Sequence, residues 1–438
     1  MGLLKSGDTF KMKSGGEAKV LAEFGSGGQG TVYRVLYNGK EYALKWYHKG
    51  VFGGKEKEFY NNLENNIQKG APTKDFLWPL GITEVFSGVF GYIMDVRPAG
   101  YHELTEFFVG SRNHKQVHFK SFEAQVEAAI NIIQGFRELH KSGYSYQDIN
   151  NGNFFINPEN GKVLICDNDN VSPYGTNLGI LGKQRYMAPE VVTGENDPDK
   201  QSDRFSLAVI LFRLFFINHP LEGLRSTPPC MTKAFERKYY GEEPVFIYDP
   251  TDNRNRPVPG TDNNLKLFWP IYPQYIRDIF IKAFSKDVMM NKGSRITETG
   301  WLNAFFRLKA SIVRCPHCKQ ETFITQIGDN TCIECKKSIH VFNEIKFTSV
   351  KLPLYPGAKI MLWHADSSQN DIETKLGEVL ANPNNPDLFG IKNTSTISWK
   401  VNLLDGSQKP LEPGKIVPIK SGFKIECTNN PTDAGEII

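Results

Sequence analysis

The chain has 438 residues, which leaves room for roughly three domains at about 150 residues per domain. Its 52 basic and 48 acidic side chains nearly balance, which excludes a dedicated nucleic-acid binder with its strong basic excess. No stretch approaches the roughly 18 unbroken apolar residues of a membrane-spanning helix, and no apolar secretory segment opens the chain, so we expect a cytoplasmic protein without nucleic-acid or membrane partners.

The first part of the chain is typical of strands with one helix. Residues 18–47 contain three strand-like runs, AKVLAEFG, TVYRVLYNG and KEYALKWY, separated by turns. Residues 55–69 predict a helix, because Phe59, Leu63 and Ile67 share one face at helical spacing. Two further strand-like runs, FLWPLGI and FGYIMDV, follow it.

From residue 121 the pattern becomes helical, and it ends in a very apolar helix near residues 203–217. Residues 223–265 carry many Pro, Asn, Asp and Gly residues and predict a long irregular insertion. After residue 345, short strand-like runs alternate with turns, which predicts a small all-β domain.

A glycine-rich loop follows the first strand-like run. Gly25, Gly27 and Gly30 fit G-x-G-x-x-G, and strands rather than a strand and a helix flank the loop. This context suits a hairpin whose backbone amides cover nucleotide phosphates. Lys45, at the end of the third strand-like run, can reach such phosphates, although alone it would be interpreted as a surface lysine on an edge strand.

Motifs further along the chain favour a phosphate-binding role for this loop. Asp148 and Asn153 lie five residues apart before the run FFIN, and Asp167 ends the next apolar run, VLIC. The segment Met187-Ala188-Pro189-Glu190 precedes Asp203 and the apolar helix, and Gly293-Ser294-Arg295 comes later. The order and spacing of these motifs match the protein-kinase signature set.

Residues from about 18 to 312 therefore resemble a eukaryotic-type Ser/Thr protein kinase domain. The resemblance implies an α+β, two-lobed kinase fold that uses ATP and Mg²⁺ to phosphorylate a protein substrate. The implied ATP-binding residues are Gly25, Gly27 and Gly30 over the phosphates, Val32 and Ala43 around the adenine, Met94 to Val96 as the hinge, and Lys45 on the α- and β-phosphates. The implied catalytic residues are Asp148 as the base, Asn153 and Asp167 as Mg²⁺ ligands, Asp203 as the brace of the catalytic loop, and Glu190 as the partner of Arg295.

The same resemblance implies a helix glutamate that pairs with Lys45. Glu64 follows Lys45 by 19 residues and is chosen on this spacing. Glu56 lies nearer the centre of the apolar helix face and stays an alternative.

Several positions depart from the family pattern. Tyr146-Gln147 replaces His-Arg, so the arginine that reads a loop phosphate is absent, and Asp167-Asn168-Asp169 replaces Asp-Phe-Gly. We therefore predict that phosphorylation of Ser172, Tyr174 or Thr176 is not the switch. A pseudokinase scaffold that binds partners without phosphoryl transfer is the first alternative, and a phosphotransferase for small molecules is the second.

Two strings, VLICDNDNV and KGAPTKDFLWPL, resemble bacterial kinases associated with tellurite-resistance gene clusters. That resemblance implies two protein partners, a metal-dependent phosphatase of the 2C type and a von Willebrand factor A-type protein.

Four cysteines follow the kinase-like region. Cys315, Cys318, Cys332 and Cys335 form C-x₂-C-x₁₃-C-x₂-C, a spacing that predicts one structural Zn²⁺ held by four thiolates. The segment resembles a zinc ribbon, and two disulfides are the alternative. The predicted domains are residues 1–312 for the kinase, 313–345 for the ribbon and 346–438 for a β-sandwich.

The β-sandwich weakly resembles a forkhead-associated domain, through Leu376-Gly377-Glu378, Ile391 to Ser395 and Leu411 to Lys415. The Gly-Arg and Ser-x-x-His landmarks of phosphothreonine binding are missing from the segment. A protein-docking module that recruits substrates is therefore the preferred interpretation.

Overall fold

The computed structural model describes residues 4–110, 115–226, 232–366, 368, 371, 374–429 and 434–438. The chain forms two compact units. The first comprises Met1–Lys120, Glu127–Trp269 and Asp278–Leu302, and the second comprises Ser121–Val126, Pro270–Arg277 and Asn303–Ile438. The predicted domain boundaries stay predictions.

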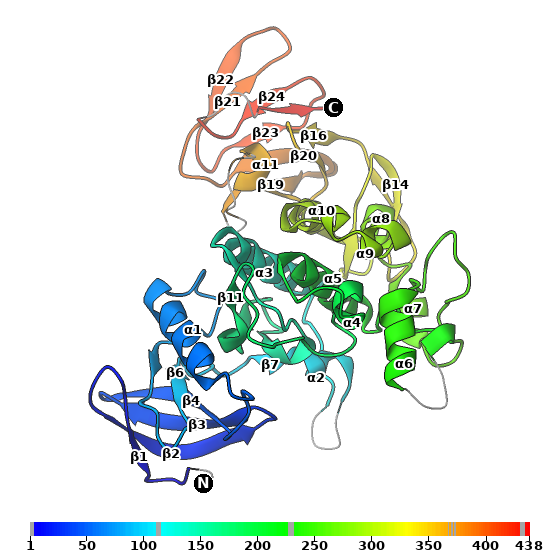
Figure 1. Cartoon of the computed structure of the whole chain (residues 1–438). Coiled ribbons are helices and arrows are strands. Elements are labelled where there is room, and N and C mark those ends of the chain that lie inside the picture. Colours follow the sequence, from blue (N-terminus) through cyan, green and yellow to red (C-terminus); the bar gives the residue numbers. More distant parts are fainter. Residues whose placement is uncertain are drawn as a thin grey trace. The chain divides into compact units, whose positions relative to one another are not determined.

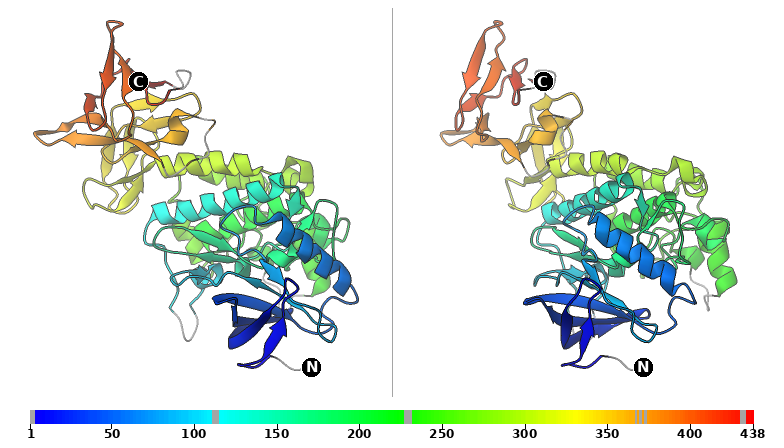
Figure 2. Two further views of the ribbon diagram at one scale, coloured as in Figure 1. Left: turned by 90° about the vertical axis from the view of Figure 1, so that its left-hand side faces the viewer. Right: turned by 60° about the vertical axis from the view of Figure 1, so that its left-hand side comes forward.

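An antiparallel six-stranded sheet opens the first unit, in the order β1-β2-β3-β4-β6-β5 (Figure 1). Its strands are β1 (Thr9–Lys11), β2 (Glu17–Ser26), β3 (Gly30–Tyr37), β4 (Lys40–Tyr47), β5 (Gly81–Ile82) and β6 (Gly91–Met94). A bridge between Met12 and Thr83 joins the chain just beyond β1 to the end of β5. The predicted helix is α1 (Glu56–Lys69), and both views of Figure 2 show it between this sheet and the helical part of the unit.

The helical part is built on α3 (Phe122–Lys141) and α5 (Lys200–Phe216), which confirms both predicted helices. The apolar residues of α5 are buried almost all round, and the Asp199 side chain caps its N-terminus by accepting from the amides of Gln201 and Ser202. The other helices are α2 (Leu104–Phe108), α4 (Pro189–Val192), α6 (Lys233–Glu236), α7 (Asn263–Phe268), α8 (Gln274–Ala283), α9 (Lys286–Met290) and α10 (Glu298–Ala310). The short strands are β7 (His102–Glu103), β8 (Tyr144–Ser145), β9 (Phe154–Ile156), β10 (Val163–Ile165) and β11 (Ser172–Pro173).

The predicted irregular segment at residues 223–265 has no helix or strand over residues 243–262, but it contains helical stretches that the sequence did not indicate. Thr232 caps α6, and α6 runs directly into a π-helical turn over Arg237–Glu242. The Thr232 hydroxyl accepts from the amide of Phe235, so a local cap stabilises helix in a segment of helix-breaking composition.

The second unit is mostly antiparallel β structure. Two hairpins carry the cysteines, and two sheets, ordered β17-β16-β25-β24-β21-β22 and β18-β19-β20-β23, follow them with one shared apolar core. The hairpin strands are β12 (Ile312–Arg314), β13 (Glu321–Phe323), β14 (Gly328–Thr331) and β15 (Ser338–Val341). The remaining elements are β16 (Glu344–Lys346), β17 (Lys351–Pro353), β18 (Lys359–Met361), α11 (Leu362–Ala365), β19 (Lys375–Asn382), β20 (Asn385–Asn393), β21 (Trp399–Asn402), β22 (Gln408–Leu411), β23 (Ile416–Pro418), β24 (Lys424–Glu426) and β25 (Gly435–Ile437). The expected all-β C-terminal region is confirmed.

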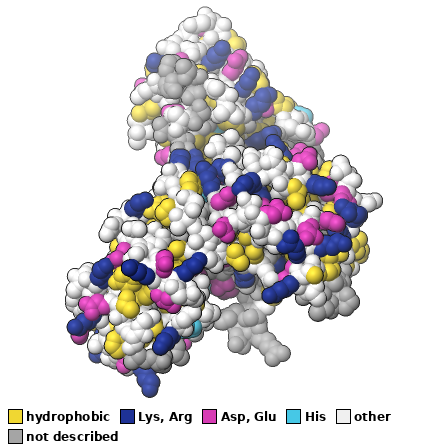
Figure 3. All heavy atoms as spheres, in the orientation of Figure 1, with side chains coloured by type: hydrophobic (Ala, Val, Ile, Leu, Met, Phe, Trp, Pro, Cys, Tyr) yellow, Lys and Arg dark blue, Asp and Glu magenta, His cyan; other side chains and the backbone are white. Residues whose placement is uncertain are grey.

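Among the described residues, none of the helices combines the length and the apolar character needed to cross a bilayer. Basic and acidic side chains are interspersed over the face of the first unit that Figure 3 shows.

Candidate active site

The glycine loop is the turn between β2 and β3. The amide of Gly27 donates to the carbonyl of Gly30 at 2.9 Å and closes the turn. A Cβ atom at Gly30 would lie 2.5 Å from the carbonyl oxygen of Trp46, so the close approach of β3 to β4 requires glycine there. A Cβ at Gly25 would meet no atom within 4 Å, so this part of the loop leaves open space beside its backbone.

An apolar cluster begins next to the glycine loop, at Val32 on β3. Val32, Ala43 and Met94 belong to this cluster, as the resemblance implies for an adenine site. The strand register brings them together: Val32 on β3 lies opposite Lys45 on β4, and Ala43 on β4 lies opposite Met94 on β6. Cys166 and the half-buried Phe155 and Leu164 join the same cluster from the helical part of the unit. Val96 is half-buried beyond the end of β6 and is not among these cluster residues. Phe155 and Leu164 were missed by the sequence analysis, although both lie on strand-like runs next to predicted site residues.

Lys45 is buried and lies at the centre of the site. Its ammonium donates to both carboxylate oxygens of Asp169, at 2.8 and 3.1 Å, and lies 3.5 Å from the carboxylate of Asp167 and 3.3 Å from Gln29 of the glycine loop. Burial alone would lower the pKa of Lys45, but the charges of Asp167 and Asp169 outweigh it and raise the pKa. Lys45 therefore stays charged at any physiological pH.

The expected ion pair between Lys45 and Glu64 is wrong for this structure. Glu64 pairs with Lys13, and Lys13 also lies over the ring of Tyr60. The residues of α1 that are buried are Phe59, Asn62, Leu63 and Asn66. Glu64 follows Leu63 by about 100° around the helix and so lies at the edge of the buried face, where interval counting could not place it.

The loop of residues 146–153, which we call the catalytic loop, positions Asp148. The side-chain amide of Asn150 donates to the Asp148 carboxylate at 3.2 Å, and the backbone amide of Lys183 also donates to it. Burial and, to a lesser extent, the nearby charge of Asp167 raise the pKa of Asp148, while these hydrogen bonds and the charge of Lys45 lower it; the net result is a pKa of about 6. Such a carboxylate is ionised at neutral pH yet basic enough to accept a proton.

Asn153 and Asp167 lie together beside Asp148 and Lys45. The side-chain amide of Asn153 is 3.5 Å from one carboxylate oxygen of Asp167, and Asp167 takes a left-handed backbone conformation, with φ of 55°. The Asp167 side chain is 45% exposed, so its oxygens are open to a ligand. A carboxylate with an amide oxygen is a hard donor set that fits Mg²⁺.

Asp203 braces this loop, as the resemblance implies. Its carboxylate accepts from the amides of Tyr146 at 2.7 Å and Gln147 at 2.9 Å, and from His140 at 3.1 Å. His140 also contacts Glu298 at 2.8 Å, which in turn pairs with Arg204. Burial would lower the pKa of His140, but its hydrogen bonds to the two carboxylates outweigh burial and raise it. The sequence analysis missed His140 and Glu298, because their 158-residue separation hides the contact.

Glu190 and Arg295 form the expected pair, with hydrogen bonds of 2.6 and 2.8 Å. Arg295 also donates to the carbonyls of Gln201 and Met289, so α4, α5 and α9 meet at its buried guanidinium. This pair fixes the end of the segment that begins at Asp167.

Gln147 holds the middle of that segment. Its backbone is left-handed, with φ of 71°, and its side-chain amide donates to the carbonyl of Thr176 at 2.7 Å and to the hydroxyl of Ser145. Ser172 is fully buried, whereas Thr176 is exposed. The neutral side-chain amide of Gln147 thus holds this segment by a hydrogen bond that needs no phosphate group.

The second unit brings the four predicted cysteines together. All four sulfurs lie within 4.8 Å of one another, with 3.7 Å between Cys315 and Cys335 and between Cys318 and Cys332. The four are free thiols, and the two pairs sit in equivalent turns that end on left-handed Lys319 and Lys336. A tetrahedron with Zn–S bonds of about 2.3 Å has edges of about 3.8 Å, so this arrangement could hold a metal ion.

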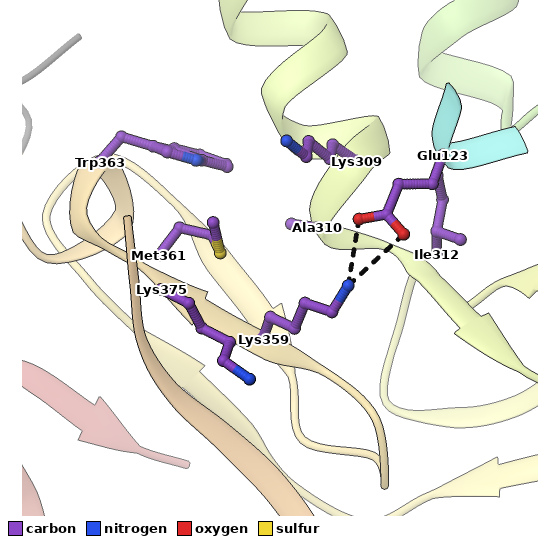
Figure 4. A pocket seen from close by; sticks show the side chains of 8 residues that line it. All are labelled: Glu123, Lys309, Ala310, Ile312, Lys359, Met361, Trp363 and Lys375. Carbon is purple, nitrogen blue, oxygen red and sulfur yellow. Dashed lines mark hydrogen bonds and ion pairs between the residues drawn. The ribbon is translucent and has the colours of Figure 1, made fainter. Parts of the chain in front are cut away.

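A separate pocket of about 390 Å³ in the second unit is lined by three lysines, Glu123 and Trp363 (Figure 4). Lys359 reaches across to Glu123 at 3.1 Å, and Lys375 pairs with Glu378 at 2.8 Å. Lys309 also has a partner. The lysine charges are engaged within the protein, and we assign the pocket no ligand.

Comparisons with known proteins agree with the site geometry. The family model described as "Protein kinase domain" matches residues 18–240, about half of the chain. Among curated proteins, the chain is 22% identical to "Protein kinase C zeta type" of Oryctolagus cuniculus over 229 residues, 50% of this chain and 37% of that protein. It is 25% identical to "Dual specificity protein kinase shkB" of Dictyostelium discoideum over 229 residues, 50% of this chain and 33% of that protein. The chain thus spans about a third of the length of these relatives.

Among solved structures, a double mutant of the PknI kinase domain of Mycobacterium tuberculosis matches with a TM-score of 0.46 and 18% identity, covering 69% of this chain and 98% of that one. The glycine loop, the buried lysine and the acidic and amide residues of the catalytic loop all lie inside the part that the family model matches. The chain belongs to the protein kinase domain family.

Proposed function

We propose that this protein is a Mg²⁺- and ATP-dependent protein kinase that phosphorylates serine or threonine in a partner protein. The observation that carries the proposal is the convergence of a charged buried Lys45 with Asp167 and Asn153. Asp148, with its raised pKa, lies on the same loop as Asn153. Phosphoryl transfer needs positioning and charge neutralisation, and these groups supply both.

Each residue has a task in this reaction. Lys45 would bind the α- and β-phosphates, the backbone of Gly25 to Gly30 would cover them, and Asp148 would orient the acceptor hydroxyl and take its proton. Asn153 and Asp167 would hold Mg²⁺, which supplies charge neutralisation on the phosphates.

The proposal is tested by incubating the full chain with γ-labelled ATP, Mg²⁺ and a general acceptor such as casein or myelin basic protein. Label should appear on serine or threonine of the acceptor, EDTA should abolish it, and Asp167→Asn should abolish it while the unfolding temperature is retained. If purified wild type transfers no label under any of these conditions yet still binds ATP, the protein is a pseudokinase scaffold instead.

We also propose that the four cysteines bind one structural Zn²⁺. Four thiolates leave no open coordination position, and one ion would tie both hairpins together in a segment with a small apolar core. Elemental analysis of the reduced protein should find about one zinc per chain, and Cys318→Ser with Cys335→Ser should lower this below about 0.2.

His317→Ala is the matched control for the zinc prediction. Its ring lies in the same turn but contacts the carbonyl of Ser338, so this variant should keep its zinc. Metal-free wild type, purified under reducing conditions and offered zinc, would contradict the proposal.

A further prediction concerns the segment after Asp167. Because Gln147 already bonds the carbonyl of Thr176, the unphosphorylated enzyme should be active. Phosphatase-treated wild type, Ser172→Ala and Thr176→Ala should each keep activity within about threefold. A loss of about tenfold in any of them, equal to about 1.4 kcal/mol in the barrier, would identify loop phosphorylation as the switch.

For partners, the proposal is a 2C-type phosphatase and a von Willebrand factor A-type protein, recruited by the C-terminal β-sandwich. It rests on the resemblance of VLICDNDNV and KGAPTKDFLWPL to kinases of tellurite-resistance clusters. Label transfer to purified candidates, with and without residues 346–438, tests it.

A further inference from the structure

The carboxylate of Asp169 is almost completely buried, with 1% exposure, and three donors converge on it. Lys45 donates to both of its oxygens, at 2.8 and 3.1 Å. The hydroxyl of Tyr47 donates at 2.6 Å and that of Tyr92 at 3.2 Å. Lys45 and Tyr47 come from β4, and Tyr92 is the register partner of Lys45 on β6. The sheet thus supplies three donors to Asp169, which itself lies in the chain after β10.

Helix α1 offers no such partner at this place. Its buried polar residues are Asn62 and Asn66, whose side-chain amides donate to the carbonyl of Val171 at 2.8 and 2.9 Å. Its residue Glu64 pairs with Lys13 instead. Helix α1 therefore binds the backbone just after Asp169 through neutral side-chain amides. The negative charge beside Lys45 comes from residues outside this helix.

The segment that carries Asp169 is itself fixed. Asp169 lies in the 3₁₀ turn η2 (Asn168–Asn170), and Asp167 directly precedes this turn. The Asn168 amide donates to the carbonyls of Leu77 and Ile165, both at 2.9 Å. Asp167 keeps a half-exposed carboxylate while Asp169 is buried, so one short turn presents one acid to ligands and the other to Lys45.

We propose that Asp169 is the positioning residue that anchors Lys45, in place of a glutamate on helix α1. The proposal rests on the proposed kinase function, since it assigns Lys45 to ATP. With this anchor, Lys45 and Asp167 are placed by a single turn of chain, and the position of α1 no longer decides whether Lys45 is aligned. Charge on the buried pair costs little in this site because every Asp169 oxygen has a donor.

The test compares Asp169→Asn with Glu64→Gln in the full chain. Asp169→Asn should raise the KM for ATP about tenfold and lower kcat/KM about 100-fold, while the KM for the acceptor protein is unchanged, because only Lys45 is misplaced. Glu64→Gln should stay within about twofold of wild type. Added to Lys45→Met, Asp169→Asn should lower activity no further, since its effect acts through Lys45.

A fluorescent ATP analogue gives a readout that does not need phosphoryl transfer. Asp169→Asn should bind it about tenfold more weakly even if the wild type proves to be a pseudokinase, so failure of the kinase function is distinguished from failure of the anchor. If Asp169→Asn does not fold, Tyr47→Phe removes the 2.6 Å donor while both charges stay, and should raise the KM for ATP about threefold. The proposal is overturned if Glu64→Gln weakens ATP binding as much as Asp169→Asn, or if neither Asp169→Asn nor Tyr47→Phe changes it.

Discussion

Replacing Asp148 with asparagine should lower kcat for phosphoryl transfer by about 10²–10⁴-fold, the usual contribution of a positioned general base. Asparagine keeps the size of the side chain but cannot accept a proton from the acceptor hydroxyl. The KM for ATP should change less than threefold, because the groups on β2 to β4 that we propose to bind ATP are untouched. Steady-state kinetics with Mg²⁺ and ATP measure both constants.

The wild type should also show a matching pH dependence. Asp148 must be ionised to act as a base, so kcat/KM should rise with pH through a midpoint near 6, the raised pKa of this carboxyl, and level off above about 7. The residual activity of Asp148→Asn should lack this step. A wild-type profile that is flat from pH 5 to 8, or an Asp148→Asn variant with normal kcat, would refute the role of Asp148.

Replacing Asp203 with alanine should lower the free energy of unfolding of the first unit by about 3–5 kcal/mol. The substitution leaves the amides of Tyr146 and Gln147 without their acceptor and removes one of the two carboxylates that contact the buried ring of His140. The catalytic loop then loses its brace, so activity should fall as well. Urea unfolding followed by circular dichroism measures the change.

Asp199→Ala is the matched control on the same helix. It removes the N-cap of α5 but no buried charge, so it should cost only about 1 kcal/mol. Equal losses for the two variants would show that Asp203 acts as an ordinary helix residue and not as the centre of a buried network.

The network around His140 also makes the free energy of unfolding of the first unit depend on pH. Because the folded protein raises the pKa of His140, its contribution is complete below the unfolded pKa of about 6.5 and is lost as pH rises through the raised value. The stability difference between wild type and His140→Gln should therefore shrink toward alkaline pH.

The sequence by itself determined the features that are encoded over short spans. The glycine hairpin, the five-residue interval from Asp148 to Asn153 and the two pairs of cysteines are each built within one turn or loop, so spacing alone gives their geometry. The partner of Arg295 and the brace at Asp203 were also predictable, because family motifs carry them.

Only the tertiary structure decided that Asp169, together with Asp167, pairs with Lys45. Asp169 lies 124 residues from Lys45 in the chain, and the contact between them depends on the register of β4 with β6 and on the turn η2. Glu64 had the right interval, but an interval does not say which side of helix α1 faces Lys45. Contacts between residues far apart in the chain, such as His140 with Glu298 and Gln147 with Thr176, exist only when several elements pack at once, and a linear pattern carries no signal for them.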